Sequence, residues 1–179
     1  MDWRKLGALL TMSTEQAFLA FFEKVPRASL CAVGYVFEIG NATPQFFLCA
    51  NTSERLRSSL QAYRSSNPQR VEDSVRWNSG DYEYPAKLLS RDELGRTWEL
   101  EYAKVEALFG AAESEAAFGK IYRRLVDACV SSLVDLAARD VFGDWTRLDF
   151  NVSETAEPFF VPRARHRHVI RGIRARVRR

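Results

Sequence analysis

Aromatic and acidic side chains are denser in residues 76–85 (RWNSGDYEYP) than anywhere else in the chain. Trp and Tyr bury large, rigid surfaces at a small entropic cost, and they are common among the residues that dominate protein interfaces. We take five side chains of this tract as candidate partner-binding residues: Trp77, Asp81, Tyr82, Glu83 and Tyr84. In the alternative interpretation, Trp77 and one Tyr belong to the core, and residues 78–81 form a turn.

Histidine is missing from residues 1–162, since both histidines of the chain lie at positions 166 and 168. This excludes Ser-His-Asp and Cys-His catalysis and HExxH zinc sites from that part of the chain. No P-loop and no GxGxxG pattern occurs. We therefore expect a chain that is not an enzyme, with no catalytic residues, no metal site and no cofactor.

Chemistry that uses carboxylates alone passes this filter, either as paired acids around a glycosidic bond or as an acid cluster that holds magnesium. Glu99 and Glu101 are the nearest such pair. On a helix, residues two apart point about 200° away from each other. We expect a solvated acidic helix face here, and a carboxylate-dependent hydrolase is the third hypothesis for function.

The last 17 residues hold a cluster of basic side chains and no acid. Its eight arginines are Arg163, Arg165, Arg167, Arg171, Arg174, Arg176, Arg178 and Arg179. Without them, residues 1–162 carry 18 basic and 23 acidic residues, a net charge of −5, although the whole chain is at +3. We expect an acidic domain over residues 1–162 that folds without its arginine-rich C-terminal tail, residues 163–179.

Three interpretations of this tail stay open. It binds nucleic acid or another polyanion, it folds back on the acidic body or on a partner subunit, or it is an idle extension. The alternation of Ile173, Ala175 and Val177 with arginines permits a strand with one cationic face.

The three cysteines are an odd number without a CxxC pair, which indicates a reducing compartment and favours the cytoplasm. Residues 29–38 and 45–50 are apolar and predict a hairpin. If Glu38 pairs with Gln45, Cys49 lies opposite Gly34 and Cys31 opposite Thr52, so no disulfide joins the two strands.

Helices are predicted after the cap-like sequences at residues 13–16, 51–54 and 90–93, the first over residues 14–24, and at 118–136, where apolar residues recur at helical spacing. Further strands are predicted over 71–77 and 145–152. Strands early and late with helices between them favour an α+β domain, with an antiparallel or mixed sheet and helices packed mainly on one face. The longest apolar stretches, 17–22 and 30–37, are far shorter than a membrane span, so we expect no membrane association.

Four short motifs carry a resemblance to a family: Val33-Gly34-Tyr35-Val36-Phe37, Asn51-Thr52-Ser53-Glu54, Arg76-Trp77-Asn78-Ser79-Gly80-Asp81-Tyr82 and Val141-Phe142-Gly143. With these motifs, residues 14–155 resemble a bacterial family of uncharacterised proteins, the domain-of-unknown-function family 4303. Tyr82 stands where a second Trp is expected, and the arginine tail is foreign to the family.

The resemblance implies a small cytoplasmic protein of the immunity type, which neutralises a bacterial toxin by binding it directly. A cognate protein toxin is then the expected partner, and an acidic surface would suit a basic toxin. The alternative is a nucleic-acid-associated protein that acts through the arginine tail.

Overall fold

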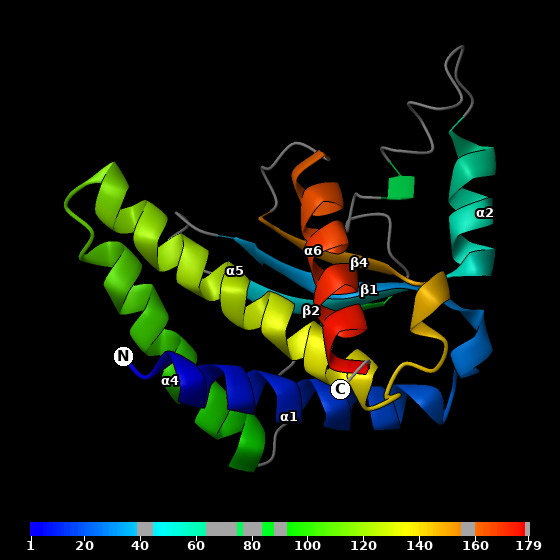
Figure 1. Cartoon of the computed structure of the whole chain (residues 1–179), viewed down its shortest axis with the longest axis horizontal. Coiled ribbons are helices and arrows are strands. Elements are labelled where there is room, and N and C mark those ends of the chain that lie inside the picture. The colour runs from blue at the N-terminus through cyan, green and yellow to red at the C-terminus, as the bar shows by residue number, and fades with distance from the viewer. Residues whose placement is uncertain (39–44, 64–74, 77–83, 88–92, 155–159, 178–179) are drawn as a thin grey trace.

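The computed structural model describes residues 1–38, 45–63, 75–76, 84–87, 93–154 and 160–177. In this part of the chain, a four-stranded sheet carries a layer of helices (Figure 1). The elements are α1 (Trp3–Phe22), β1 (Leu30–Glu38), β2 (Gln45–Thr52), α2 (Ser53–Ala62), β3 (Tyr84–Lys87), α4 (Glu93–Gly110), α5 (Glu115–Ala138), β4 (Asp149–Glu154) and α6 (Phe160–Val177). Short 3-10 turns at Arg27–Ser29 and Trp145–Arg147 precede β1 and β4.

The sheet is mixed, with the strand order β3-β2-β1-β4. Strand β1 runs antiparallel to β2 and parallel to β4, and β2 runs antiparallel to β3. The predicted hairpin register is confirmed, since Glu38 pairs with Gln45 and Gly34 with Cys49. It breaks at one end, where Thr52 pairs with Leu30 instead of Cys31 because an irregularity of the β-bulge type adds a residue to β1.

Strand β1 is buried on both faces, as expected of a central strand. Val33, Tyr35 and Phe37 belong to the main core, whereas Ala32 and Val36 pack with Cys49 in a smaller cluster. The pairing of the strands and the order of the elements confirm the predicted α+β class with a mixed sheet.

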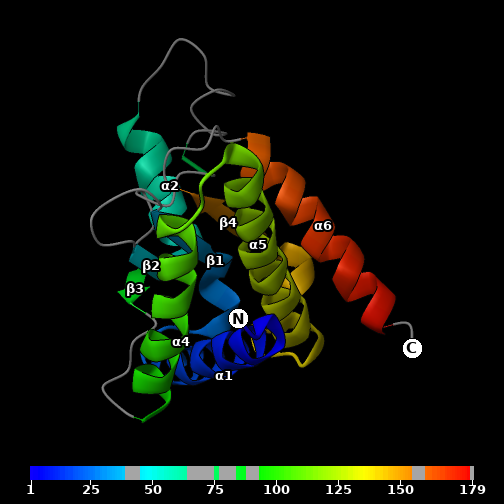
Figure 2. The same cartoon turned by 90° about the vertical axis from the view of Figure 1, so that its left-hand side faces the viewer.

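The main helices gather on one face of the sheet, as predicted. Helices α4, α5 and α6 stand side by side in Figure 2, and α1 packs across α4 and α5. Trp98 and Tyr102 of α4, Leu125 and Leu133 of α5 and Leu10 of α1 all enter the same core. Helix α2 contacts the sheet through β2 and stands apart from this layer.

Helix α1 begins at Trp3, so the predicted start near residue 14 is wrong. Asp2 is the true N-cap, because its Oδ1 accepts the backbone N–H groups of Arg4 and Lys5 at 3.0 and 3.1 Å. Ser13 and Thr14, which resemble a cap in sequence, are buried inside the helix. The hydroxyls of Thr14 and Tyr35 are hydrogen-bonded at 2.7 Å, so a tertiary contact accounts for this polar side chain.

The strand predicted over residues 71–77 is wrong at the two positions that the structure describes, since Val75 and Arg76 are helical. The other five positions lie outside the described residues. The prediction rested on Val71, Val75 and Trp77, which alternate with polar residues at 72, 74 and 76. The two valines are also four residues apart, however, which is a helical spacing. A short apolar pattern of this kind fits both periods.

The arginine-rich segment is a helix and not a strand, and its described part is not a separate tail. Helix α6 begins at Phe160, so the boundary expected between residues 162 and 163 lies inside it. Val169 and Ile173, four residues apart, are fully buried in the main core. Of the three interpretations left open by the sequence, the structure shows the segment folded back on the body.

Candidate functional site

Helix α6 closes one edge of the sheet. Strand β4 pairs with β1 on one side, and on the other the backbone N–H of Phe150 donates to Nδ1 of His166 at 3.0 Å. Arg165 donates from Nη1 to the backbone oxygen of Val152 at 2.6 Å. Two adjacent side chains of α6 thus bond the backbone groups of an edge strand, which otherwise attract other strands.

The same two side chains tie α6 to its surroundings. Arg165 also donates to the hydroxyl of Tyr122 at 3.1 Å and lies 5.5 Å from the centre of that ring. Burial lowers the pKa of His166 below its ordinary value, Arg167 and Arg76 lower it further, and Asp149 opposes them. A neutral imidazole is what the hydrogen bond from Phe150 requires, since Nδ1 must accept.

The arginines expected to bind a polyanion divide into two groups. The first group has partners within the protein: Arg165 donates to the backbone of β4, and Arg176 pairs with Asp135 of α5. Arg163 is half-buried and has interactions of its own, and residues 178 and 179 lie outside the described part. The second group, Arg167, Arg171 and Arg174, is exposed on the outer face of α6.

A groove of about 820 Å³ lies between α1 and α5, with the last turns of α6 at its margin. Small side chains and one methionine form much of its lining: Gly7, Ala8 and Met12 of α1, and Ala128, Ser131 and Ala138 of α5. Met12 is 54% exposed although it is large and apolar. Such a surface, apolar with a charged rim, is typical of protein interfaces.

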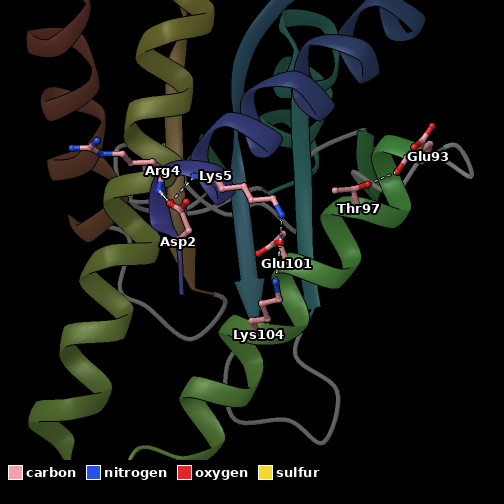
Figure 3. A network of polar contacts seen from close by, with 7 residues as sticks. All are labelled: Asp2, Arg4, Lys5, Glu93, Thr97, Glu101 and Lys104. Atoms are coloured by element: carbon pink, nitrogen blue, oxygen red, sulfur yellow. Dashed lines mark hydrogen bonds and ion pairs between the residues drawn. The ribbon is translucent and has the colours of Figure 1, made fainter.

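Charged side chains of both signs line this groove: Arg4, Arg124, Asp127, Asp135, Arg139 and Arg176. Two of the arginines have acidic partners, since Nη1 of Arg139 lies 3.0 Å from Oε2 of Glu15 and Arg176 pairs with Asp135. Arg4 and Arg124 form no side-chain ion pair with any residue that the structure describes. In Figure 3 the Arg4 side chain points away from the neighbouring Lys5.

The acidic pair considered from the sequence does not form a site. Glu101 is buried and faces α1, and it accepts hydrogen bonds from Lys5 of α1 at 2.5 Å and from Lys104 of its own helix at 2.9 Å (Figure 3). The hydrogen bonds from Lys104 and Lys5 hold the pKa of Glu101 below its ordinary value. Glu99 is exposed. The expected solvated face is therefore correct for Glu99 but wrong for Glu101, which joins α4 to α1.

The three cysteines are free, and each is packed in the protein. Cys49 and Cys129 are fully buried, and burial raises the pKa of both thiols. Cys31 is half-buried, and burial together with the charge of Asp149 raises its pKa to about 11. Since the thiolate is the reactive form, these positions disfavour nucleophilic chemistry.

Most of the aromatic tract lies outside the described residues, including Trp77, Asp81, Tyr82 and Glu83. Tyr84 is the first residue of β3 and pairs with Ala50 of β2. The partner-binding role of these five residues stays a prediction.

Two further findings concern the described residues alone. They contain no group of three or more His, Cys, Asp or Glu side chains placed to hold a metal ion. Among their helices, none combines the length and the apolar character needed to cross a membrane.

A family described as a domain of unknown function, DUF4303, matches residues 10–159. The chain belongs to this family. The match covers α1 from its third turn through β4 and ends just before α6, the helix that closes the sheet edge. No curated protein and no solved structure matches the chain.

Neither the α1–α5 groove nor the closure of β4 by α6 was predicted from the sequence. Two features of α1 could have indicated the groove. Its residues Gly7, Ala8 and Thr11 are small, and the apolar Met12 does not belong to the buried face of the helix, which contains Leu6, Leu10 and Thr14. The closure gives no such signal, because it joins the backbone of one segment to side chains 13 to 16 residues further along.

Proposed function

We propose that this protein is a non-catalytic binding protein of the immunity type, which acts in the cytoplasm and neutralises a bacterial toxin by covering its active site. The observation that carries the proposal is the α1–α5 groove. It is a large surface depression with small apolar side chains and an exposed methionine, surrounded by charges. Methionine side chains adapt to irregular partners and are frequent on binding surfaces.

The placement of the reactive side chains supports a binding role over catalysis. Buried thiols with raised pKa values are poor nucleophiles, and His166 is held by the backbone of β4. Glu101, the buried member of the candidate acid pair, is neutralised by two lysines. These groups stabilise the fold.

The charges of the groove alter the expected partner. Because α6 is docked, residues 1–162 and the arginines share one body, and a uniformly acidic surface is not what a toxin would meet. Arg4 and Arg124 at the groove favour acidic side chains at the corresponding positions of the toxin. We therefore expect apolar side chains of the toxin over Met12 and acidic ones at the rim.

Co-expression with the toxin encoded beside its gene tests this proposal. The protein should protect the host cell and form a complex in which toxin activity is abolished. Met12→Asp places a charge in the groove and should weaken the complex by 2 kcal/mol or more, about 30-fold in affinity. Leu100→Asp is the matched control, because Leu100 is 69% exposed on α4 and lies outside the groove lining.

Three outcomes would contradict parts of the proposal. Failure of the wild-type protein to protect the cell or bind the toxin would refute the immunity function. An equal loss of affinity for the toxin in Met12→Asp and Leu100→Asp would refute the groove as the contact surface. If only Tyr82→Ala with Tyr84→Ala weakens a complex of the folded protein, the aromatic tract is the binding surface instead.

A further inference from the structure

The outer face of α6 is a fixed row of cationic side chains. Arg167, Arg171 and Arg174 follow each other at intervals of four and three residues, which places them on one side of the helix. All three side chains are exposed, and none of them forms a side-chain hydrogen bond or ion pair with any residue in the described part of the chain. Together with His166 and Ile170 they line a shallow hollow of about 330 Å³.

The helix beneath this row is held in place. Val169 and Ile173 on the opposite side are fully buried, and Arg165 and His166 bond the backbone of β4. Gly172 lets α6 approach α5 closely, since an added Cβ would lie 2.7 Å from Cγ2 of Val134. The three guanidinium groups are thus presented by a packed element and not by a flexible tail.

We propose that this face of α6 binds the phosphate backbone of nucleic acid, independently of base sequence. Arg167 and Arg174 are seven residues apart, which is a rise of roughly 10 Å along the helix axis. Phosphates of one duplex strand rise by about 3.4 Å each along the duplex axis, so this rise covers roughly three phosphate steps and each of the three arginines has a phosphate within its span.

The composition of the helix supports phosphate as the target. Every cation from residue 121 to the C-terminus is an arginine or a histidine, with no lysine, and α6 has no acidic residue. The planar guanidinium donates two parallel hydrogen bonds to phosphate, which an ammonium group does not. Residues 161–177 contain no Phe, Tyr or Trp on which a base might stack, so the outer face offers charge for phosphates without a stacking platform for bases.

An anionic membrane is the less suitable polyanion for this face. A helix that binds a lipid surface inserts an apolar side between the headgroups. In α6 that side, with Val169 and Ile173, is already buried against the protein. The outer face offers charge without large apolar side chains beside it, apart from the half-buried Ile170 and from Val177 in its last turn.

Fluorescence anisotropy with two labelled 20-base-pair duplexes of unrelated sequence tests the proposal on the full chain. Both duplexes should bind equally, and log affinity should fall against log salt with a slope near −3, from about 0.9 for each of three contacts. Raising the salt from 50 to 200 mM should then weaken binding about 40-fold. A preference of more than tenfold for one sequence would overturn the absence of base recognition.

The decisive variants remove equal charge from two places. Arg167→Gln with Arg171→Gln and Arg174→Gln should reduce affinity at 50 mM salt at least tenfold and bring the slope close to zero. The control Arg55→Gln with Lys120→Gln and Arg123→Gln removes three exposed cations from α2 and α5. It should keep the slope, and equal losses in the two triple variants would overturn α6 as the site.

Two measurements keep the result interpretable. If the α6 triple variant fails to unfold cooperatively, Arg171→Gln alone decides, because loss of one contact should reduce the slope by about one. Vesicles of phosphatidylserine and phosphatidylcholine form the second arm. Tighter binding to vesicles than to duplex, lost in the α6 variant, would replace nucleic acid by a membrane as the partner.

Discussion

The backbone N–H of Phe150 in β4 donates a hydrogen bond to the imidazole Nδ1 of His166 in α6, at 3.0 Å. One turn of helix thereby takes the place of a neighbouring strand, because Arg165 bonds the oxygen of Val152 on the same edge. Exposed strand edges invite pairing with other chains, and proteins commonly cover them. The arginine-rich segment therefore has a structural role at its inner face, whatever its outer face binds.

Truncation after Pro162 should destabilise the protein, contrary to the expectation from sequence. The truncation removes Val169 and Ile173, two fully buried side chains whose burial stabilises the folded protein by about 4 kcal/mol together. It also uncovers the core that they contact and the edge of β4. Urea denaturation should show a lower or lost transition, and light scattering should show association through the open edge. A truncated monomer with unchanged unfolding would contradict the role of α6.

Acidification should weaken the closure of β4 through His166. Its pKa is lowered in the folded protein by burial, so below the ordinary histidine value of about 6.5 the unfolded chain binds more protons. The free energy of unfolding should therefore fall as the pH drops through this range, by at most about 1.4 kcal/mol per pH unit.

Two variants isolate this contribution from the carboxylates. His166→Gln should show a flatter dependence of stability on pH between 7 and 5, because the titrating group is gone. His168→Gln, at an exposed position two residues away, should follow the wild type. If both variants behave alike, the pH dependence does not come from His166.

Two glycines should respond oppositely to alanine. At Gly34 a Cβ would lie 1.9 Å from the backbone oxygen of Asn151, so Gly34→Ala must separate β1 from β4 and should cost about 3 kcal/mol. At Gly7 a Cβ would meet nothing within 4 Å, and alanine is the better helix former by about 1 kcal/mol. Urea midpoints should shift down for the first and up for the second, and a tolerated Gly34→Ala would refute the close approach of β4.

Tyr35→Phe should destabilise the core by about 1–3 kcal/mol. The Tyr35 hydroxyl is hydrogen-bonded to Thr14 of α1 at 2.7 Å and to Ser132 of α5 at 2.9 Å, and it joins the sheet to both helices. Tyr102→Phe is the control, since Tyr102 is also buried but forms no hydroxyl hydrogen bond with a described residue. Equal unfolding free energies for the two variants would show that the network contributes nothing.

Thiol titration should give three free thiols per chain after denaturation without reductant. In the native protein at pH 8 the reaction should be slow, with Cys31 first, because its pKa is about 11 while Cys49 and Cys129 are fully buried. Cys31→Ser should remove the first phase. A single titratable thiol after denaturation would reveal a disulfide and contradict the hairpin register.

Elements with a local pattern could be predicted from the amino-acid sequence. Trp98, Tyr102 and Val105 recur at helical spacing and are buried on α4. The two apolar runs of β1 and β2, which are neighbours in the sequence, predicted the hairpin and its register. Such features follow from backbone periodicity, because neighbours on a helix face or across a hairpin are close in sequence as well as in space.

Contacts between distant segments could not be predicted in this way and are seen in the folded protein. Ser13 and Thr14 form a plausible cap in sequence, yet Thr14 bonds Tyr35, 21 residues away, and the helix continues through both. The sequence left the arginine segment open as a strand or a tail. In the structure it is a helix, because Val169 and Ile173 are buried in the core and the backbone N–H of Phe150 donates to His166. The α1–α5 groove has the same origin. Burial and the satisfaction of backbone groups are properties of the assembled chain, and no local pattern contains them.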